Sequence, residues 1–190
     1  VSSIGVGLLL KAHFTIPQVF LITGLLNAVV AFNIFMLVPE YLLRFIAWVL
    51  TRLIYRFEVK GEQNIPTQGA AILVCNHVSF VDAVLLMAAS PRPIRFIMDH
   101  KIFAIPVLGG LFRLAKAIPI APFRDDPATY EQAFAQGRQV LADGDLLCIF
   151  PEGAITRDGE LGEFKGGVMK LLETHPVPVV TLALRNLWGS

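Results

Sequence analysis

The feature that most limits what this chain can fold into is a long stretch without charge. From Phe14 to Val38 there is no Asp, Glu, Lys or Arg. About 20 apolar residues of helix are enough to cross the hydrocarbon core of a bilayer, so the stretch predicts a membrane-spanning helix. Its residues Asn27 and Asn33 are expected to face other helices rather than lipid. The alternative is a buried helix of a soluble domain. Residues 1–10 are interpreted as the end of a preceding spanning helix.

A second helix is expected directly after this stretch. Pro39 and Glu40 suit a first helical turn, because proline lacks the donor that this position cannot use and an acid favours the positive end of the helix dipole. Residues 41–57 are amphipathic, and one broad face carries residues spaced by multiples of four: Arg44, Trp48, Arg52 and Arg56. A basic face with an aromatic residue predicts a helix on a membrane surface, and the alternative is a solvated connection. The arginines after the apolar stretch outnumber Lys11 before it, which places the globular part in the cytoplasm.

Composition excludes some classes of protein. The 190 residues are 55% hydrophobic and 16% charged, whereas roughly a quarter of a typical soluble domain is charged, so part of the chain is expected to meet lipid. The net charge is +1, and no basic patch is interleaved with aromatic residues, which argues against nucleic acid as a partner. Cys75 and Cys148 lie in apolar, strand-like runs and are interpreted as reduced, buried thiols in a cytosolic setting.

Short apolar runs alternate with helical stretches from residue 59 onward. The expected strands are residues 70–75, 94–98, 117–120, 146–150 and 177–184, and the expected helices are residues 81–89, 103–116, 129–142 and 166–174. Asp126-Pro127 and Asp143-Gly144 supply start and stop signals for the third of these helices. The alternation predicts an α/β fold, with a largely parallel sheet flanked by helices and preceded by a transmembrane helix and an amphipathic helix. The expected organisation is therefore a membrane-spanning end at 1–38, an amphipathic connecting helix at 39–58 and a globular domain at 59–190.

Two of the expected strands end in polar clusters, where ligands gather in sheets of this kind. The first cluster reads NHVSFVD from Asn76 to Asp82, and the second reads FPEG at residues 150–153. Ser79 and Asp82 have the spacing of a capping box, which would give both a structural role at a helix start. His77 precedes that start, so its ring can reach Asp82. The carboxylate would then hold the imidazole tautomer and leave the other ring nitrogen free to take a proton.

Other interpretations of nearby residues are weaker. Cys75 shares a strand face with His77, which would suit a thiol nucleophile, but the apolar residues before it favour core packing. A metal site would need more ligands than Asp99 and His100, so no metal and no cofactor are predicted. The glycine pairs at 109–110 and 166–167 lack the lysine and hydroxyl of a phosphate loop and are expected in tight turns. The apolar segment 102–114 is either part of an acyl-chain channel or ordinary core.

The two motifs together resemble the glycerolipid acyltransferase family, which contains 1-acylglycerol-3-phosphate and lysophospholipid acyltransferases. The resemblance rests on N-H-x-S-x-x-D at residues 76–82 followed by F-P-E-G at residues 150–153, and it covers roughly residues 59–184. It implies an acyltransferase domain that moves a fatty acyl group from a thioester, either acyl-ACP or acyl-CoA as co-substrate, to a lysophospholipid. In this family resemblance His77 is the general base and Asp82 orients it.

The resemblance also implies roles in substrate binding. Arg124, which ends the stretch IPIAPFR, would hold the phosphate of the acceptor. Glu152 and Gly153 would line the acceptor site, and the stretch VPVV at residues 177–180 would lie near the acyl donor. The predicted binding set is completed by the two polar neighbours of the base, Asn76 and Ser79.

One departure from the family pattern concerns the phosphate. Many members have a hydroxyl residue and an arginine directly after F-P-E-G, but here Ala154 and Ile155 occupy those places. Arg157 and Lys165 are therefore candidate phosphate-binding cations, and ordinary solvated loop charges are the alternative. Glu152 is unexpected beside an anion, and a structural role in holding backbone or an arginine explains it equally well.

A spanning helix ahead of such a domain, with the stretches FPEGAITRDG and LALRNLWGS, resembles a group of fused proteins. In these a lysophospholipid transporter precedes a 2-acylglycerophosphoethanolamine acyltransferase, and an acyl-carrier-protein synthetase often follows. On this interpretation the chain is a middle piece cut at both ends, in the inner membrane, with its globular domain on the cytoplasmic face. Its expected partners are membrane lipid, a lysophospholipid acceptor and an acyl-carrier-protein or coenzyme A thioester. The first-choice acceptor is 2-acylglycerophosphoethanolamine and the second is 1-acylglycerol-3-phosphate.

Two rival functions remain open at this point. Water in place of the alcohol would make the protein a thioesterase. A non-catalytic, lipid-binding membrane adaptor would need neither His77 nor Asp82.

Overall fold

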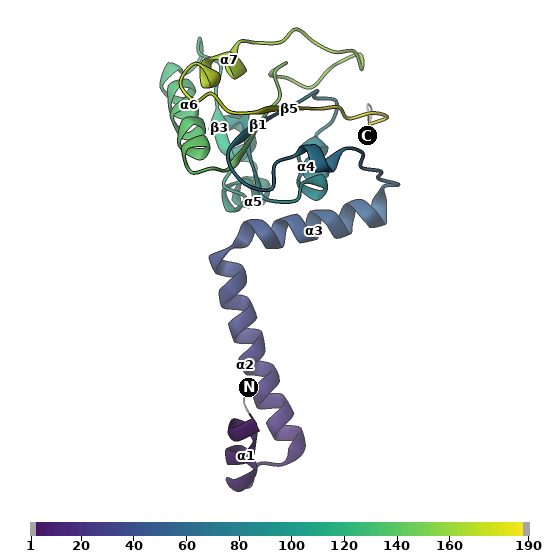
Figure 1. Cartoon of the computed structure of the whole chain (residues 1–190), viewed down its shortest axis with the longest axis vertical. Helices are drawn as coiled ribbons and strands as arrows, with labels where there is room; N and C mark the ends of the chain where they lie inside the picture. Colours follow the sequence, from purple (N-terminus) through teal and green to yellow (C-terminus); the bar gives the residue numbers. More distant parts are fainter. Residues whose placement is uncertain (1–2, 188–190) are drawn as a thin grey trace. The chain divides into compact units, whose positions relative to one another are not determined.

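The structure is a computed structural model that describes residues 3–187. The chain divides into two compact units, Val1–Pro39 and Glu40–Ser190. Predictions that fall on residues 1–2 and 188–190, including the last three residues of LALRNLWGS, lie outside the described residues. The first unit holds α1 (Ser3–Lys11) and α2 (Ile16–Leu37), which are purple to violet in Figure 1.

Helix α2 coincides with the charge-free stretch of the sequence. Among the described residues it is the one helix that is long and apolar enough to cross a membrane. It starts at a capping box, in which the Thr15 backbone N–H donates to Gln18 Oε1 at 2.8 Å. Asn33 Nδ2 donates to the carbonyl of Val29 at 2.8 Å, so part of this polar side chain is satisfied inside the helix itself. Such a bond lowers the cost of placing Asn33 in lipid and weakens the reason for expecting it to face another helix.

The second unit is an α/β fold around one parallel sheet. Its strands follow the order β3-β2-β4-β1-β5, and every neighbouring pair is parallel, which confirms the predicted fold class. The elements in chain order are α3 (Pro39–Ile54), η1 (Glu62–Asn64), β1 (Ala71–Cys75), α4 (Asp82–Ala89), β2 (Ile94–Asp99), η2 (His100–Ala104), α5 (Leu108–Leu114), β3 (Ile118–Ile120), α6 (Pro127–Ala142), β4 (Leu146–Ile149), α7 (Gly167–Leu172) and β5 (Val179–Leu182).

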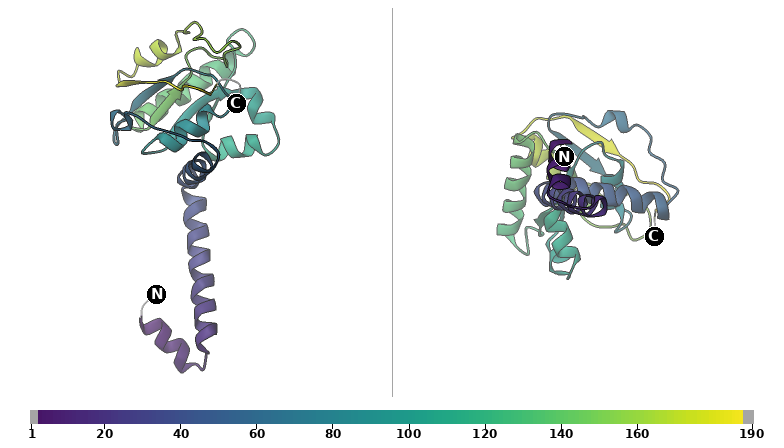
Figure 2. Two further views of the ribbon diagram at one scale, coloured as in Figure 1. Left: turned by 90° about the vertical axis from the view of Figure 1, so that its right-hand side faces the viewer. Right: turned by 90° about the horizontal axis from the view of Figure 1, so that it is seen from below.

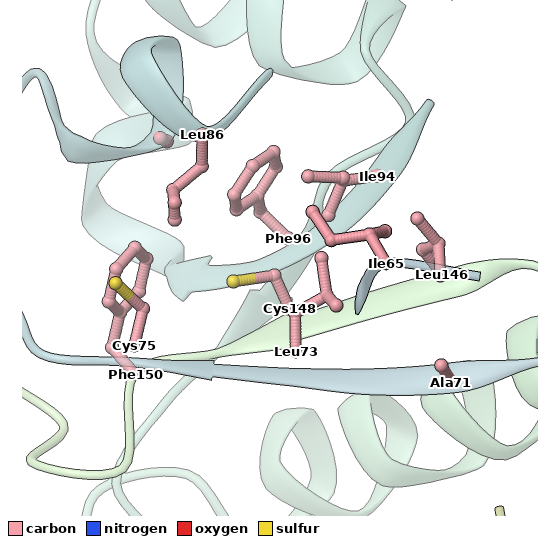
Figure 3. Packing of buried hydrophobic residues seen from close by; sticks show 11 residues of the cluster. Ile65, Ala71, Leu73, Cys75, Leu86, Ile94, Phe96, Leu146, Cys148 and Phe150 are labelled. Atoms are coloured by element: carbon pink, nitrogen blue, oxygen red, sulfur yellow. The ribbon is translucent and has the colours of Figure 1, made fainter. Parts of the chain in front are cut away.

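Successive side chains along a strand point to opposite faces of the sheet, and strands β1 and β4 are buried on both faces, whereas β5 is only partly covered. On one face, Leu73, Cys148 and Phe96 pack with Leu86 of α4, as Figure 3 shows. On the other face, β-strand side chains pack against α6 and α7 in a second cluster that includes Phe134 and Leu171. The central strands β1 and β4 are therefore almost wholly apolar, and their first polar neighbours come only where each strand ends.

Helix α6 ends at Ala142 as predicted and begins at Pro127, within its predicted start signal and two residues before the predicted range. Asp126 is its N-cap and accepts from the backbone N–H of Thr129 at 3.0 Å, with Pro127 in the first turn. Gly144 follows the helix with a φ of 82°, a left-handed conformation that glycine adopts without steric cost.

Three predicted helix boundaries are wrong. The expected helix 103–116 is divided into η2 and α5, because Pro106 cannot continue a helix and Val107 has a φ of 68°. Ser79 is not the N-cap of the helix after β1, since α4 begins at Asp82 with Val81 as its N-cap. Helix α3 ends at Ile54 rather than Phe57, so Arg56 is not on it.

Candidate active site

The carboxyl ends of β1 and β4 lie side by side, because these strands are parallel neighbours in the sheet. His77 follows β1 by two residues and Glu152 follows β4 by three. Strand pairing therefore brings together the two polar clusters that the sequence separates. The backbone N–H of His77 donates to Glu152 Oε1 at 2.9 Å, which closes the contact between them.

The His77 ring is paired with a buried carboxylate. Nδ1 of His77 lies 2.8 Å from Oδ2 of Asp82. The same oxygen accepts from the backbone N–H groups of Val78 and Ser79 at 2.7 and 2.9 Å. Because Asp82 acts as an acceptor for these donors, the hydrogen at Nδ1 points to the carboxylate and Nε2 is the basic nitrogen of the ring. The Asp82 side chain is 0% exposed and that of His77 is 21% exposed, so the imidazole can be reached from outside while its partner cannot.

The local sequence explains why these groups meet. The chain leaves β1 at Cys75 and turns through residues 76–81 before α4 begins. The Asp82 carboxylate folds back from the first turn of α4 and closes this turn by accepting from Val78 and Ser79. Negative charge is also favoured at a helix N-terminus. The turn therefore needs Asp82 for its own backbone hydrogen bonds as well as for the ring of His77.

The backbone and the ring of His77 are also held by the segment after β4. The Thr156 N–H donates to the carbonyl of His77 at 2.9 Å. The ring stacks on Phe150 with a centroid distance of 4.2 Å and an interplanar angle of 20°. The strand pattern of the sequence predicts Phe150 only as the end of a strand. Its place in the motif F-P-E-G is the available signal that it belongs to the site.

Glu152 contacts backbone groups with both carboxylate oxygens. Oε1 accepts from His77, and Oε2 accepts from the N–H of Gly162 at 2.8 Å. The side chain is largely buried, with 8% of the residue exposed. These contacts match the structural role that the sequence left open, in which the carboxylate holds backbone. Its predicted contact with substrate stays a prediction.

The predicted binding residues Asn76 and Ser79 are engaged within the protein. Asn76 Nδ2 donates to the Leu184 carbonyl at 3.0 Å, and Asn76 Oδ1 accepts from the Leu184 N–H at 2.8 Å. This pair of bonds joins the end of β1 to the segment after β5. Ser79 is buried, and its backbone N–H donates to Asp82. A role in binding substrate stays a prediction for both residues.

The three candidate cations lie on segments that follow strands β3 and β4. Arg124, four residues after β3, is exposed, and β3 is three strand spacings, about 14 Å, from β1. Arg157 is exposed in a turn, where hydrogen bonds from the Glu160 N–H and the Thr156 hydroxyl hold the pKa of Asp158 below its ordinary value.

Lys165 lies against the Glu152 turn. A Cβ at Gly153 would stand 2.5 Å from Lys165 Nζ, so the ammonium group lies against this glycine, whose φ is 68°. The backbone N–H of Lys165 donates to the carbonyl of Pro151 at 2.8 Å. The charged group of Lys165 therefore lies beside the turn that carries Glu152.

The thiol alternative does not fit the geometry. Cys75 is 1% exposed and Cys148 is 0% exposed. Burial raises the pKa of the Cys75 thiol to about 12 and that of Cys148 well above its ordinary value. Because the thiolate is the reactive form, both residues are core side chains, and Figure 3 shows them among the apolar residues under α4.

A cavity of about 370 Å³ lies elsewhere. It is lined by residues of α3, of the segment before β1 and of the last turn of α4, including Trp48, Arg52, Gly61 and Ala89. Because α4 starts beside His77 and runs away from it, this cavity belongs to the opposite end of the helix and not to the strand ends described above.

The fold and the strand-end geometry define an α/β protein with a histidine base aligned by a buried carboxylate. The family model described as Acyltransferase matches residues 56–185, and the chain belongs to this acyltransferase family.

Named relatives and a solved structure agree with this assignment. The chain is 30% identical over 131 residues to the chloroplastic 1-acyl-sn-glycerol-3-phosphate acyltransferase BAT2 of Brassica napus, covering 68% of this chain and 37% of the relative. It is 32% identical over 143 residues to the 1-acyl-sn-glycerol-3-phosphate acyltransferase of Pseudomonas aeruginosa, covering 74% and 54%. The crystal structure of the 1-acyl-sn-glycerophosphate acyltransferase PlsC from Thermotoga maritima superposes with a TM-score of 0.52 at 26% identity, covering 63% of this chain and 46% of that one. The chain thus spans about a third to a half of the length of these relatives.

Proposed function

We propose that the protein is an O-acyltransferase that moves a fatty acyl group from an acyl thioester to the free hydroxyl of a lysophospholipid. The observation that carries the proposal is the His77 ring, paired at Nδ1 with the buried Asp82 carboxylate at 2.8 Å. Family membership supplies the reaction class. A fixed base of this kind suits a reaction in which an alcohol must lose its proton as it attacks.

In the proposed reaction, Nε2 of His77 takes the proton from the acceptor hydroxyl while the hydroxyl oxygen attacks the thioester carbonyl. The new C–O ester bond forms and the C–S bond breaks. The proton held by the imidazolium then passes to the departing thiolate, so no acyl-enzyme is required. Asp82 stabilises the imidazolium between these steps, which is the usual contribution of a carboxylate behind a histidine base. No metal or cofactor takes part in this scheme.

The acceptor's phosphate requires a cation near the base. Lys165 is our first choice, because its ammonium group lies beside Gly153 in the turn that also holds His77. Arg157 and Arg124 are exposed on neighbouring segments and are the second and third choices. Charge-assisted hydrogen bonds to phosphate are short and strong, so neutralising the correct cation should raise KM for the acceptor more than it changes kcat.

Two acceptors are carried forward as candidates. The stretch FPEGAITRDG and the apolar N-terminal helix favour 2-acylglycerophosphoethanolamine, whereas the relatives reported above are named for 1-acyl-sn-glycerol-3-phosphate. A panel of both acceptors, each with acyl-ACP and acyl-CoA, distinguishes these possibilities and also identifies the donor. Thioester loss that does not depend on any acceptor would instead support a thioesterase.

We further propose that the protein lies in the inner membrane with the α/β unit on the cytoplasmic side. The apolar α2 supports membrane association, and the arginines that follow it support the orientation. In that orientation Lys11, which precedes α2, lies on the outer side of the membrane. An impermeant amine reagent should therefore reach Lys11 in right-side-out vesicles, and protection of Lys11 would contradict the orientation.

The catalytic proposal is tested by replacing the base. His77→Ala in the purified full chain is expected to lower kcat by about 10²–10⁴-fold, the usual worth of a positioned general base. The matched control is His175→Ala, because His175 precedes β5 and therefore lies at the other edge of the sheet. Unchanged acyl transfer by His77→Ala would overturn the mechanism. If the unmodified protein and His77→Ala both bind lipid and neither turns over substrate, the result would support a non-catalytic adaptor.

A further inference from the structure

The segment between β2 and β3 exposes apolar side chains that neither the core nor the proposed chemistry explains. We call residues 100–114, which form η2 and α5, the hairpin. Only Phe103 and Gly109 of this segment are buried, so the expectation of ordinary core is wrong for most of it. The exposed residues are Ile105 (46%), Val107 (87%), Leu108 (43%), Leu111 (42%) and Leu114 (41%). Contiguous apolar surface of this kind marks a contact with another apolar body.

Hydrogen bonds hold the hairpin in a compact turn. The Gly109 N–H donates to the Ile105 carbonyl at 2.8 Å, and Arg113 donates to the Phe103 carbonyl at 3.0 Å. A Cβ at Gly109 would stand 2.1 Å from that same carbonyl oxygen, so η2 and α5 pass each other closely. Val107 lies between η2 and α5, at the tip of the hairpin, and is 87% exposed.

Helix α3 presents a second apolar surface beside the hairpin. Its buried side carries Ala47 (5%) and Thr51 (3%), and Arg44 donates to the Ser90 carbonyl at the end of α4. Its outward side exposes large apolar residues: Tyr41 (53%), Phe45 (60%), Ile46 (42%) and Leu53 (77%). Lys116, two residues after the hairpin, donates to Glu40 in the first turn of α3 at 2.9 Å.

These two surfaces are adjacent in the α/β unit. Figure 2 shows α3 end-on in its left view, with the teal hairpin next to it, and the Lys116–Glu40 contact joins their ends. The hairpin and α3 are therefore neighbours in this unit.

The occupant that fits this side is a phospholipid surface. Helix α3 begins at Pro39, directly after the apolar α2 that ends at Leu37, so the start of α3 is held by the chain at the point where α2 would leave a bilayer. Two basic side chains of these elements are exposed, Arg52 on α3 and Lys101 in η2. Apolar and aromatic residues bordered by cations are typical of structures that lie in the headgroup region.

We infer that the hairpin, side by side with α3, rests on the bilayer and inserts Val107 and Leu111 at the level of the lipid headgroups. The hairpin starts at the carboxyl end of β2, at the same sheet edge as His77. The inference rests on the membrane location proposed above and does not depend on the proposed reaction.

Environment-sensitive dyes on introduced cysteines test this contact in the full chain. Cys75 and Cys148 are buried, so native protein is labelled selectively at Val107→Cys or Leu111→Cys. Ala135→Cys is the matched control, because Ala135 is exposed on α6, which covers the other face of the sheet. In phospholipid nanodiscs, we expect emission from positions 107 and 111 to shift to shorter wavelength and to be quenched by lipids that carry a quencher near the headgroup. Position 135 should show neither effect.

Two results would overturn the inference. Emission from positions 107 and 111 that matches position 135 would place the hairpin in water. A shift to shorter wavelength that quencher lipids do not reduce would mean that protein, not lipid, covers it.

A second variant measures the contribution of the tip itself. Val107→Asp, added to the labelled Leu111→Cys protein, removes an exposed apolar side chain and should not disturb the fold. We expect the ratio of lipid-quenched to unquenched dye to fall about tenfold, the equilibrium effect of withdrawing one side chain of this size from an apolar environment. Unchanged quenching would contradict insertion of the tip.

Discussion

Glu152 shows how a carboxylate can lie in a site proposed to bind an anionic acceptor. Both of its oxygens accept from backbone N–H groups, those of His77 and Gly162. These donors satisfy the buried charge, as buried carboxylates require. They also link the turn after β1 to the segment after β4. We therefore predict that Glu152 positions His77, and contact between Glu152 and substrate stays a prediction.

Glu152→Gln tests this role at the scale of one residue. The amide offers one oxygen acceptor where the carboxylate offers two, so one backbone N–H loses its partner. We expect the free energy of unfolding to fall by about 1–3 kcal/mol, and kcat to fall while KM for the thioester changes little. Glu163→Gln, an exposed residue of the same segment, is the control. A lower stability with an unchanged kcat and pH–rate profile would show that Glu152 holds the fold but does not position the base.

The hairpin provides a prediction at the scale of an element. Gly109→Ala would place a Cβ 2.1 Å from the Phe103 carbonyl oxygen, whereas Gly110→Ala meets no atom within 4 Å. Gly109→Ala should therefore lower the free energy of unfolding by about 1–3 kcal/mol, as overpacking typically does. Gly110→Ala in the same helix should raise it by up to about 1 kcal/mol, because alanine favours helix over glycine. Denaturant unfolding of the pair measures both, and equal stabilities would mean that the close passage of η2 and α5 relaxes at little cost.

The elements also show where pattern reasoning succeeds. The start of α6 follows from Asp126 and Pro127, because a cap and a first-turn proline act within a few residues. Pro106 is a local signal for the division of 103–116 into η2 and α5. The prediction of one helix gave more weight to the apolar character of the segment than to this proline. Which side of α3 is buried had no such signal, because it depends on contacts of Glu40 and Arg44 with residues far along the chain.

At the scale of the α/β unit, Glu40 predicts a dependence of stability on pH. Burial acts to raise its pKa, but the hydrogen bond from Lys116 and the charges of Lys116 and Arg95 outweigh this and lower the pKa below 4.5. A carboxyl group with a lowered folded pKa contributes stability above its unfolded pKa, and loses it as pH falls through the folded value. Glu40→Gln should therefore reduce the stability measured near neutral pH and flatten its loss below pH 4.5. Glu173→Gln, an exposed residue, is the control, and an unchanged slope in Glu40→Gln would contradict the assignment.

The sequence by itself determined the features that depend on neighbouring residues. These are the charge-free helix, the alternation of strands and helices, and the contact of His77 with Asp82. These follow from interactions between residues a few positions apart, where periodicity, caps and short turns decide the outcome. Only the tertiary structure decided the order β3-β2-β4-β1-β5, which brings Glu152 and Phe150 to His77 and Leu184 to Asn76. It also decided that the apolar hairpin faces outward. Such contacts join residues far apart in the chain, and strand pairing and the burial of both sheet faces select them, because no local pattern specifies which strands become neighbours.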